Sequence, residues 1–146
     1  MRLILSLALL TLAACGSKTL ETKKVSLTAN DTMQFSSKEF TAKVGQTLEI
    51  EFKNVGKMPV EAMGHNLVIL AIGADPMAFG VAATPAKDTG HIPPGMKDSV
   101  LAHTKVLGPG ESETLTFTPT KSGQYPFLCS FPGHFAAMRG LIKVSP

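Results

Sequence analysis

The sequence predicts an all-β protein, an antiparallel Greek-key β-sandwich of seven to eight strands with one short helical insertion. Short segments of alternating polar and apolar residues recur along the chain, and the 10 prolines and 13 glycines cluster between them. Such alternation indicates half-buried strands, and regularly spaced turn residues between short strands are typical of sandwiches. With 146 residues, 44% of them hydrophobic and 17% charged, the chain can bury the core of one domain.

The predicted strands follow one another with short turns between them. The clearest covers residues 47–52, where Leu48, Ile50 and Phe52 face inward and the residues between them face outward. Residues 33–44 read as one strand that is bent or bulged at its serine pair. The predicted strands are 25–29, 33–44, 47–52, 66–71, 100–107, 113–118, 125–130 and 140–145.

Three segments depart from this regular pattern. Apolar residues in 75–84 repeat at helix spacing, which predicts the helical insertion, although Gly80 weakens it. Residues 87–97 contain two prolines and two glycines and read as a long loop. Pro126 lies inside a predicted strand and cannot donate to a sheet ladder, so it indicates an edge position or a bulge.

The N-terminal segment reads as an export signal and is set apart from the fold. Arg2 precedes an apolar run over residues 3–12, which is shorter than the roughly 20 residues of a membrane span. The next residues, Leu-Ala-Ala-Cys-Gly, resemble the bacterial lipoprotein signal, in which the cysteine is lipidated and becomes the first mature residue. This resemblance implies a lipid on Cys15. Ordinary secretion, with Cys15 incidental or in a disulfide, is the alternative.

The chain is therefore divided into a signal peptide at 1–14, a lipidated cysteine with a tether at 15–24, and one domain at 25–146. Fully extended, the tether residues after the cysteine reach roughly 30 Å, enough to hold a small domain off a membrane surface. Gly16 follows the cysteine where inner-membrane retention uses aspartate. We therefore expect a lipid-anchored protein on the periplasmic side of a bacterial membrane, with the outer membrane favoured.

One short segment near the C-terminus carries three kinds of metal-ligand donor. Cys129, His134 and Met138 are spaced as C-x4-H-x3-M. A trigonal copper site uses two imidazoles, one cysteine sulfur and a weak, distant methionine. The segment has one histidine, so another must come from elsewhere, and His65 is the best candidate. Because strand ends can meet at one pole of a sandwich, we expect His65 to lie against this loop.

Each of these residues also has a simpler explanation. A lone cysteine is more often part of the core, Met138 alone is more often packing, and either histidine could be a core or turn residue. Cys129 and His134 could form a nucleophile–base pair, but no orienting residue is evident and Met138 would be left without a purpose. Zinc is also chemically possible, but its sites usually take no methionine. If Cys15 is lipidated, Cys129 is a lone thiol in an oxidising compartment. A bound metal would protect this thiol from oxidation.

These motifs are similar to those of the azurins, a family of type 1 blue copper proteins with the cupredoxin fold. The similarity covers about residues 25–144, which is almost the whole predicted domain, and its motifs are specific. The matching segments are Met63-Gly64-His65-Asn66, Ala102-His103-Thr104-Lys105, Leu107-Gly108, Gly110-Glu111, Cys129-Ser130-Phe131-Pro132-Gly133-His134 with Met138, Asn30-Asp31 and Met33-Gln34-Phe35.

The resemblance implies one type 1 copper ion that alternates between Cu(I) and Cu(II). His65, Cys129 and His134 would be its equatorial ligands. Met138 would be a weak axial ligand, and the backbone carbonyl of Gly64 a distant fifth donor. The copper would make the protein a single-electron carrier.

The resemblance also implies residues that support the ligands and a surface that docks partners. Asn66 would brace the ligand loop and bind near the cysteine sulfur, and the amide of Phe131 would donate to the same sulfur. Such outer contacts orient ligands and tune the metal. The expected docking patch is apolar and consists of Met33, Met58, Met63, Phe131, Pro132, Phe135, Ala136 and Ala137.

The chain departs from the family pattern at several positions. Lys23 and Gln46 stand where azurins usually have disulfide cysteines, and loss of such a bridge costs about 2–5 kcal/mol unless packing compensates. Asn54 replaces a histidine whose titration is linked to pH in the family, so this linkage should be missing. His91 and His103 are expected to be non-ligands, with His103 exposed.

The predicted function is electron transfer between periplasmic or membrane-bound redox proteins, such as a c-type cytochrome or a copper reductase, without enzymatic activity. The alternative is a periplasmic copper carrier or buffer with the same site, although no methionine- or histidine-rich tail favours it. A net charge of +3 without a basic run, one tyrosine and no tryptophan argue against nucleic-acid binding. We expect a monomer whose contact with the membrane is the lipid on Cys15.

Overall fold

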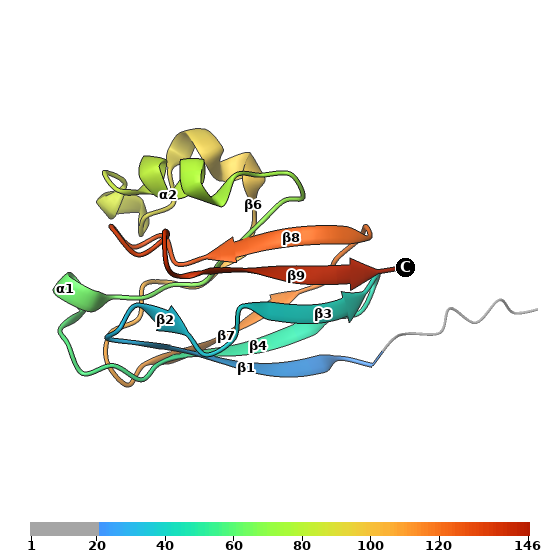
Figure 1. Cartoon of the computed structure of the whole chain (residues 1–146), viewed down its shortest axis with the longest axis horizontal. Coiled ribbons are helices and arrows are strands. Elements are labelled where there is room, and N and C mark those ends of the chain that lie inside the picture. The colour runs from blue at the N-terminus through green and yellow to red at the C-terminus, as the bar shows by residue number, and fades with distance from the viewer. Residues whose placement is uncertain (1–20) are drawn as a thin grey trace, which may run out of the picture.

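The structure, a computed structural model, describes residues 21–146, so the predicted signal peptide and Cys15 lie outside the described residues. In the described part of the chain, nine strands form two sheets that pack face to face (Figure 1). The predicted all-β sandwich is therefore confirmed. Residues 21–146 contain no helix that is both long and apolar enough to span a membrane.

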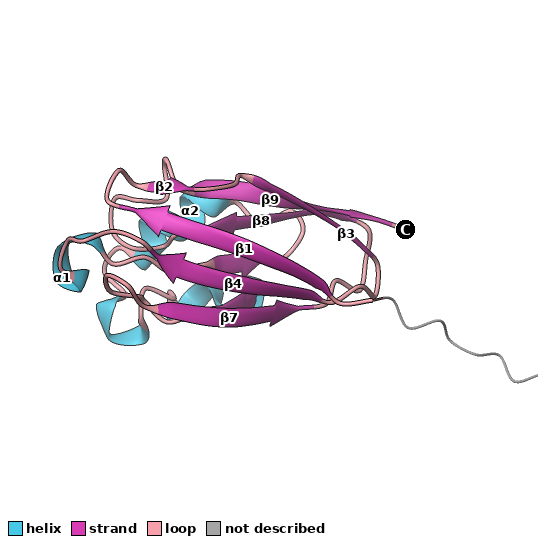
Figure 2. Ribbon diagram, turned by 90° about the horizontal axis from the view of Figure 1, so that it is seen from below, coloured by secondary structure: helices cyan, strands magenta, loops and turns pink. Residues whose placement is uncertain are grey.

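The first sheet consists, in spatial order, of β2 (Gln34–Phe35), β1 (Lys23–Asn30), β4 (Leu48–Asn54) and β7 (Ser112–Phe117) (Figure 2). β1 begins two residues earlier than the sequence predicted. Leu48, Ile50 and Phe52 of β4 are fully buried, and the residues between them are more exposed, as the alternation predicted.

The second sheet consists, in spatial order, of β3 (Glu39–Lys43), β9 (Arg139–Ser145), β8 (Gly123–Leu128), β5 (Val68–Leu70) and β6 (Val100–His103). β8 ends directly before Cys129, and β9 begins directly after Met138. The loop with the three predicted donors therefore connects two paired neighbouring strands.

The expectation of purely antiparallel sheets is wrong, because β1 pairs with β4 and β3 pairs with β9 in parallel. The segment 33–44 is not one strand but crosses from the first sheet, as β2, to the second, as β3. Ser36 lies at the crossing: its amide donates to the Thr28 carbonyl at 2.9 Å, and its hydroxyl accepts the Thr28 amide at 2.9 Å. Serine side chains bind nearby backbone in this way and so compete with a regular ladder. This division brings the strand count to nine.

The expectation that Pro126 lies on an edge strand or at a bulge is also wrong. β8 lies between β9 and β5, and Pro126 is in regular register opposite Leu141 of β9. On the other side, β5 pairs only with Phe127 and Leu128. Because the pairing with β5 stops before Pro126, the missing amide proton interrupts no ladder on that side.

The helical insertion is confirmed as α2 (Pro76–Ala83). The carboxylate of Asp75 accepts the Met77 amide at 2.8 Å, and Pro76 occupies the first helical position, both of which favour a helix start. The structure also contains elements that the sequence did not predict. They are the one-turn helix α1 (Val60–Met63) and the 3-10 helices η1 (Lys87–Thr89) and η2 (Pro94–Ser99).

Hydrogen bonds occupy the region of Lys23 and Gln46, where the family resemblance would place a disulfide. The ammonium group of Lys23 donates to the Thr41 carbonyl at 2.7 Å. The side-chain amide of Gln46 accepts the Lys43 amide at 3.1 Å and donates to the Glu21 carbonyl at 3.3 Å. These contacts link the start of β1 to β3 and to the turn after it without a covalent bridge.

The sandwich is elongated, and its two poles differ. β1 begins and β9 ends at one pole, whereas α1, the end of β8 and the start of β9 lie at the other (Figures 1 and 2). We call the second end the loop pole. The predicted metal donors belong to the loop pole.

Candidate metal centre

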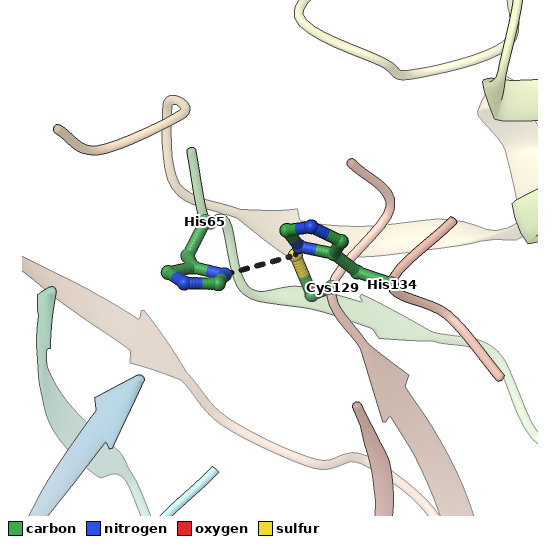
Figure 3. Close-up of side chains that lie close together, drawn as sticks. All are labelled: His65, Cys129 and His134. Carbon is green, nitrogen blue, oxygen red and sulfur yellow. Dashed lines mark hydrogen bonds between the residues drawn. The ribbon is translucent and has the colours of Figure 1, made fainter. Parts of the chain in front are cut away.

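Three predicted donors, His65, Cys129 and His134, converge at the loop pole (Figure 3). Their ligand atoms all lie within 4.8 Å of one another, and all three residues are buried. The sulfur of Cys129 is 3.9 Å from Nδ1 of His65 and 3.7 Å from Nδ1 of His134. No other group of this kind is found among residues 21–146.

His65 is held by a short backbone bridge before β5 begins. Its amide donates to the Leu107 carbonyl at 3.2 Å, and the Leu107 amide donates to the His65 carbonyl at 2.7 Å. The buried side chain of Asn54 donates to the same Leu107 carbonyl at 3.0 Å and accepts the Gly56 amide at 2.8 Å. The backbone at His65 is therefore fixed by a chain of buried hydrogen bonds.

The loop between β8 and β9 is closed by its own backbone. The Cys129 amide donates to the Met138 carbonyl at 2.9 Å, and the Met138 amide donates to the His134 carbonyl at 2.8 Å. Gly133 has φ +81°, a conformation that glycine adopts readily and that lets the chain turn immediately before His134. Met138 is fully buried, so the structure places this predicted donor inside the protein.

Asn66 joins the His65 segment to the ligand loop. Its side-chain oxygen accepts the Ser130 amide at 2.8 Å, and its side-chain nitrogen donates to the Ser130 hydroxyl at 2.8 Å. The same nitrogen lies 3.4 Å from the Gly90 carbonyl. The residues adjacent to His65 and Cys129 in sequence are thus bound to each other.

Gly64 allows the chain to pass close to its neighbours before His65. A Cβ atom at this position would collide with the side chains of Val106 and Phe131 and with the Val60 carbonyl. The position is buried and has room only for glycine. Glycine at this position therefore lets the chain pass between α1 and the ligand loop immediately before His65.

Burial determines the protonation of the three donors. It raises the pKa of the Cys129 thiol to about 12, although the backbone amides of Asn66 and Phe131 act in the opposite direction. Burial, together with His65, lowers the pKa of His134 to about 4. The pKa of His65 is also lowered by burial, against the opposing effect of the Asn30 carbonyl. At neutral pH the metal-free centre therefore holds a thiol and two neutral imidazoles.

The distances between these donors suit coordination of one metal ion better than they suit hydrogen bonds among the three side chains. Bonds of about 2.0–2.3 Å arranged trigonally around one ion place donor atoms about 3.7 Å apart, close to the distances from the Cys129 sulfur. One S–H proton cannot satisfy both imidazole nitrogens, and these separations are long for strong hydrogen bonds. Sulfur and imidazole donors suit both copper and zinc, and a methionine thioether, which zinc sites usually lack, favours copper.

The remaining predicted residues have different positions. His91 and His103 are outside the donor cluster, as expected, and His103 is exposed while His91 is buried. In the expected docking patch, Met33, Met58, Ala136 and Ala137 are exposed and Met63, Phe131, Pro132 and Phe135 are half-buried.

Sequence reasoning missed several residues that shape this centre. Ser130 follows Cys129 directly, so its position could have drawn attention, but its bond to Asn66 leaves no pattern in the sequence. The ring of His91 packs edge-on against Phe131, with ring centroids 5.3 Å apart. Phe135 packs on α2 at Gly80, where a Cβ atom would overlap its ring. No spacing rule connects these residues.

Comparison with known proteins is consistent with this geometry. The sequence model of copper-binding proteins of the plastocyanin/azurin family matches residues 21–145. Azurin-2 of Alcaligenes xylosoxydans xylosoxydans is 41% identical over 128 residues, covering 80% of this chain and 92% of that protein. Outer membrane protein H.8 of Neisseria meningitidis is 40% identical over 119 residues, covering 80% of this chain and 64% of that protein.

A solved structure shares the fold. The dithionite-reduced auracyanin of Roseiflexus castenholzii superposes with a TM-score of 0.75 at 35% sequence identity, covering 86% of this chain and 99% of that chain. This similarity extends over both sheets, so it includes the strands that position the donor cluster.

Proposed function

The chain belongs to the plastocyanin/azurin family of copper-binding proteins and is a blue copper electron carrier, and we propose that His65, Cys129 and His134 hold its copper. The observation that carries this assignment is the convergence of three buried donor atoms within 4.8 Å. Bound copper would supply a one-electron couple. The protein's own contribution would be a dry, rigid set of donors that needs little rearrangement when the charge on the metal changes.

Met138 and Gly64 would complete the coordination. Met138 is fully buried, and its backbone is bonded to both Cys129 and His134, so it belongs to the same rigid loop. Its thioether would be the weak axial donor, and the Gly64 carbonyl a distant donor. A neutral thioether together with a neutral carbonyl adds no charge to the site, and the thiolate would be its only anionic ligand.

Asn66 and Phe131 would tune the cysteine sulfur. Their backbone amides are directed at the sulfur and lower the pKa of Cys129 against the effect of burial. Donors that stabilise a thiolate also reduce the electron density it gives to a metal. We therefore infer that these amides help to set the reduction potential.

Electron exchange would take place at the loop pole, over the apolar patch defined above. Met33 and Met58 are 37% and 41% exposed, although both are large hydrophobic residues. An apolar surface of this kind supports brief encounters with small interfaces, which suits a carrier that must release its partner. A c-type cytochrome or a copper reductase is the class of partner we propose.

Such a carrier would catalyse no reaction of its own. We propose that it is held to the membrane by a lipid on Cys15, on the periplasmic side of the outer membrane, and that it works as a monomer. The lipoprotein-like sequence around Cys15 supports this placement. One relative at 40% identity carries the name of an outer membrane protein.

The decisive experiment is an optical and EPR spectrum after one equivalent of Cu(II) is added to the protein from residue 16 onward. An intense blue absorption with a narrow copper hyperfine splitting is expected. Cys129→Ser should abolish the blue colour and serves as the control. An ordinary pale copper spectrum from the unaltered protein would overturn the ligand assignment.

A further inference from the structure

A cavity of about 730 Å³ lies beside the metal centre and is not used by the proposed electron transfer. It is open on one side and is lined by α1, the segment around η1, the residues from His103 onward, and Phe131 and Pro132 of the ligand loop. Its volume is within the range of small-molecule sites, about 300–1,000 Å³. The residues that line it include Val60, Glu61, Lys87, Thr104, Lys105 and Val106.

His91 provides a hydrogen-bond acceptor in the cavity wall. The residue is only 7% exposed, and its Nδ1 lies 3.1 Å from the Ala83 carbonyl. A carbonyl can only accept, so Nδ1 carries the proton, and in the neutral ring Nε2 has a free lone pair. Among residues 21–146, nothing is hydrogen-bonded to this Nε2.

The backbone at His91 is unusual. Its φ of +64° is in the left-handed region, which is uncommon for residues other than glycine and is more accessible to asparagine and histidine. The amide of His91 donates to the Ala86 carbonyl at 2.8 Å, which holds the residue in this conformation. The bond between Nδ1 and the Ala83 carbonyl and the edge-on packing against Phe131 hold the imidazole in the wall of the cavity.

His103 provides a second acceptor. Its Nδ1 lies 3.0 Å from the Thr104 carbonyl, so the same reasoning leaves a lone pair on Nε2. His103 is exposed and also lines the cavity, whereas His91 is buried in its wall. The cavity therefore has one acceptor in a buried part and one in an exposed part.

The arrangement indicates the class of ligand. His91, His103 and Glu61 do not form a three-donor cluster in the described structure, so one metal ion cannot be held by all three. The apolar side chains of Val60, Val106 and Phe131 suit a flat ring instead. We propose that the cavity binds a small aromatic molecule with hydroxyl donors, of the phenol or hydroquinone class, through Nε2 of His91 and His103.

The cavity is connected to the metal centre through one aromatic ring. The ring of Phe131 is 5.3 Å from that of His91 and 4.9 Å from that of His134, centroid to centroid. A ligand in the cavity would therefore contact a residue that packs on a copper donor. The binding itself goes beyond the proposed electron transfer and does not depend on the copper.

Binding is tested by titrating hydroquinone into the 15N-labelled protein from residue 16 onward, loaded with Cu(I) under argon, and recording amide spectra. The titration is repeated without metal, so that a failure of copper binding is seen separately. Saturable shifts at Gly90, Thr104 and Phe131 are expected, with a Kd on the order of 1 mM for so small a ligand. Amides of Thr41 and Gln124, which line a separate cavity, should not move.

The donors are tested with the dimethyl ether of hydroquinone, which keeps the ring and lacks both hydroxyl protons. It should bind at least roughly fivefold more weakly, since each lost hydrogen bond weakens binding by about three- to tenfold. Equal binding of the ether would overturn the proposal. So would the absence of shifts up to 20-fold above the expected Kd of about 1 mM.

The acceptors are tested with His91→Asn, which retains a residue that tolerates the left-handed conformation, and with the exposed His103→Asn. Each should weaken hydroquinone binding by roughly three- to tenfold. Lys87→Gln is the matched control, because it changes the charge of the lining but removes no acceptor, and it should leave binding unchanged. Loss of binding in Lys87→Gln with retention in both histidine variants would show that Lys87, and not the histidines, holds the hydroxyl groups, and would overturn the proposal.

Discussion

Asn66 and Ser130, which are 64 residues apart in the sequence, are joined by two hydrogen bonds of 2.8 Å. One bond satisfies a buried backbone amide and the other a buried hydroxyl. The pair connects the segment of His65 to the segment of Cys129 independently of any metal. The donor positions therefore depend on this pair as well as on the sheets.

Asn66→Ala should destabilise the metal-free protein and loosen the centre. It removes both bonds and leaves the Ser130 amide buried without a partner, which should lower the free energy of unfolding by about 2–3 kcal/mol. Ser130→Ala loses only the hydroxyl bond and should cost about 1 kcal/mol. Urea unfolding of both variants measures the difference, and equal losses would contradict the predicted importance of the Ser130 amide.

Copper binding should release one proton per ion. Because the pKa of Cys129 is raised to about 12, the thiol is protonated at neutral pH and must lose its proton to bind Cu(II). His134, with its pKa lowered to about 4, and His65, whose pKa is also lowered, are already neutral and release none. The apparent affinity for Cu(II) should therefore rise about tenfold per pH unit between roughly pH 5.5 and 7.5.

Calorimetry in buffers of different ionisation enthalpy measures this proton count directly. A value that stays near one across this pH range is expected. A count that rises toward two or three at the acidic end would show that the imidazoles titrate normally, and would contradict the effect assigned to their burial.

Gly80→Ala should disturb the ligand loop from a distance. A Cβ atom at position 80 overlaps the ring of Phe135, the neighbour of His134, so the ring must move. The gain in helix propensity is about 1 kcal/mol, and overpacking of this kind costs about 1–3 kcal/mol, so a net loss of stability is expected. Gly95→Ala is the control, because nothing lies within 4 Å of its added Cβ atom. If the copper spectrum and the unfolding midpoint of Gly80→Ala match those of the control, α2 does not support the loop.

Met138→Leu should leave the copper protein blue but raise its reduction potential. Leucine keeps the volume of this fully buried side chain, and so the core, while it removes the thioether. Loss of a donor that stabilises the oxidised metal makes reduction easier. Voltammetry measures the shift, and an unchanged potential would argue against Met138 as the axial ligand.

Cys15→Ala should release the protein from membranes. Fractionation of cells that express the full chain would then find it in the soluble periplasmic extract, whereas the unaltered protein should sediment with membranes. Ser17→Ala, two residues later, is the control and should remain membrane-bound. If the Cys15 variant also remained in the membrane fraction, lipidation at this residue would not be the anchor.

The sequence was informative where a local rule determines the structure. The alternation of Leu48, Ile50 and Phe52 predicted β4, and the helix spacing of the apolar residues in 75–84 predicted α2. The donor cluster followed from its ligand chemistry, because cysteine, histidine and methionine at these spacings suit few ions other than copper.

The structural features that the sequence did not predict depend on contacts between segments distant in the sequence. Whether residues 33–44 stay in one sheet or cross to the other is decided by bonds between Ser36 and Thr28, which no periodicity records. Pro126 is tolerated inside the sheet because β5 is short, which its own sequence context cannot indicate. The contact of His91 with Phe131 depends on the path of a loop, which the sequence pattern does not indicate either.

The separation of the two poles has a consequence for orientation. The start of β1 lies at the end of the sandwich opposite the loop pole (Figure 1). A domain held from its N-terminal end would turn its donor cluster outward, away from the lipid surface. Such a molecule would meet partners that diffuse in the periplasm or project into it more readily than groups embedded in its own membrane.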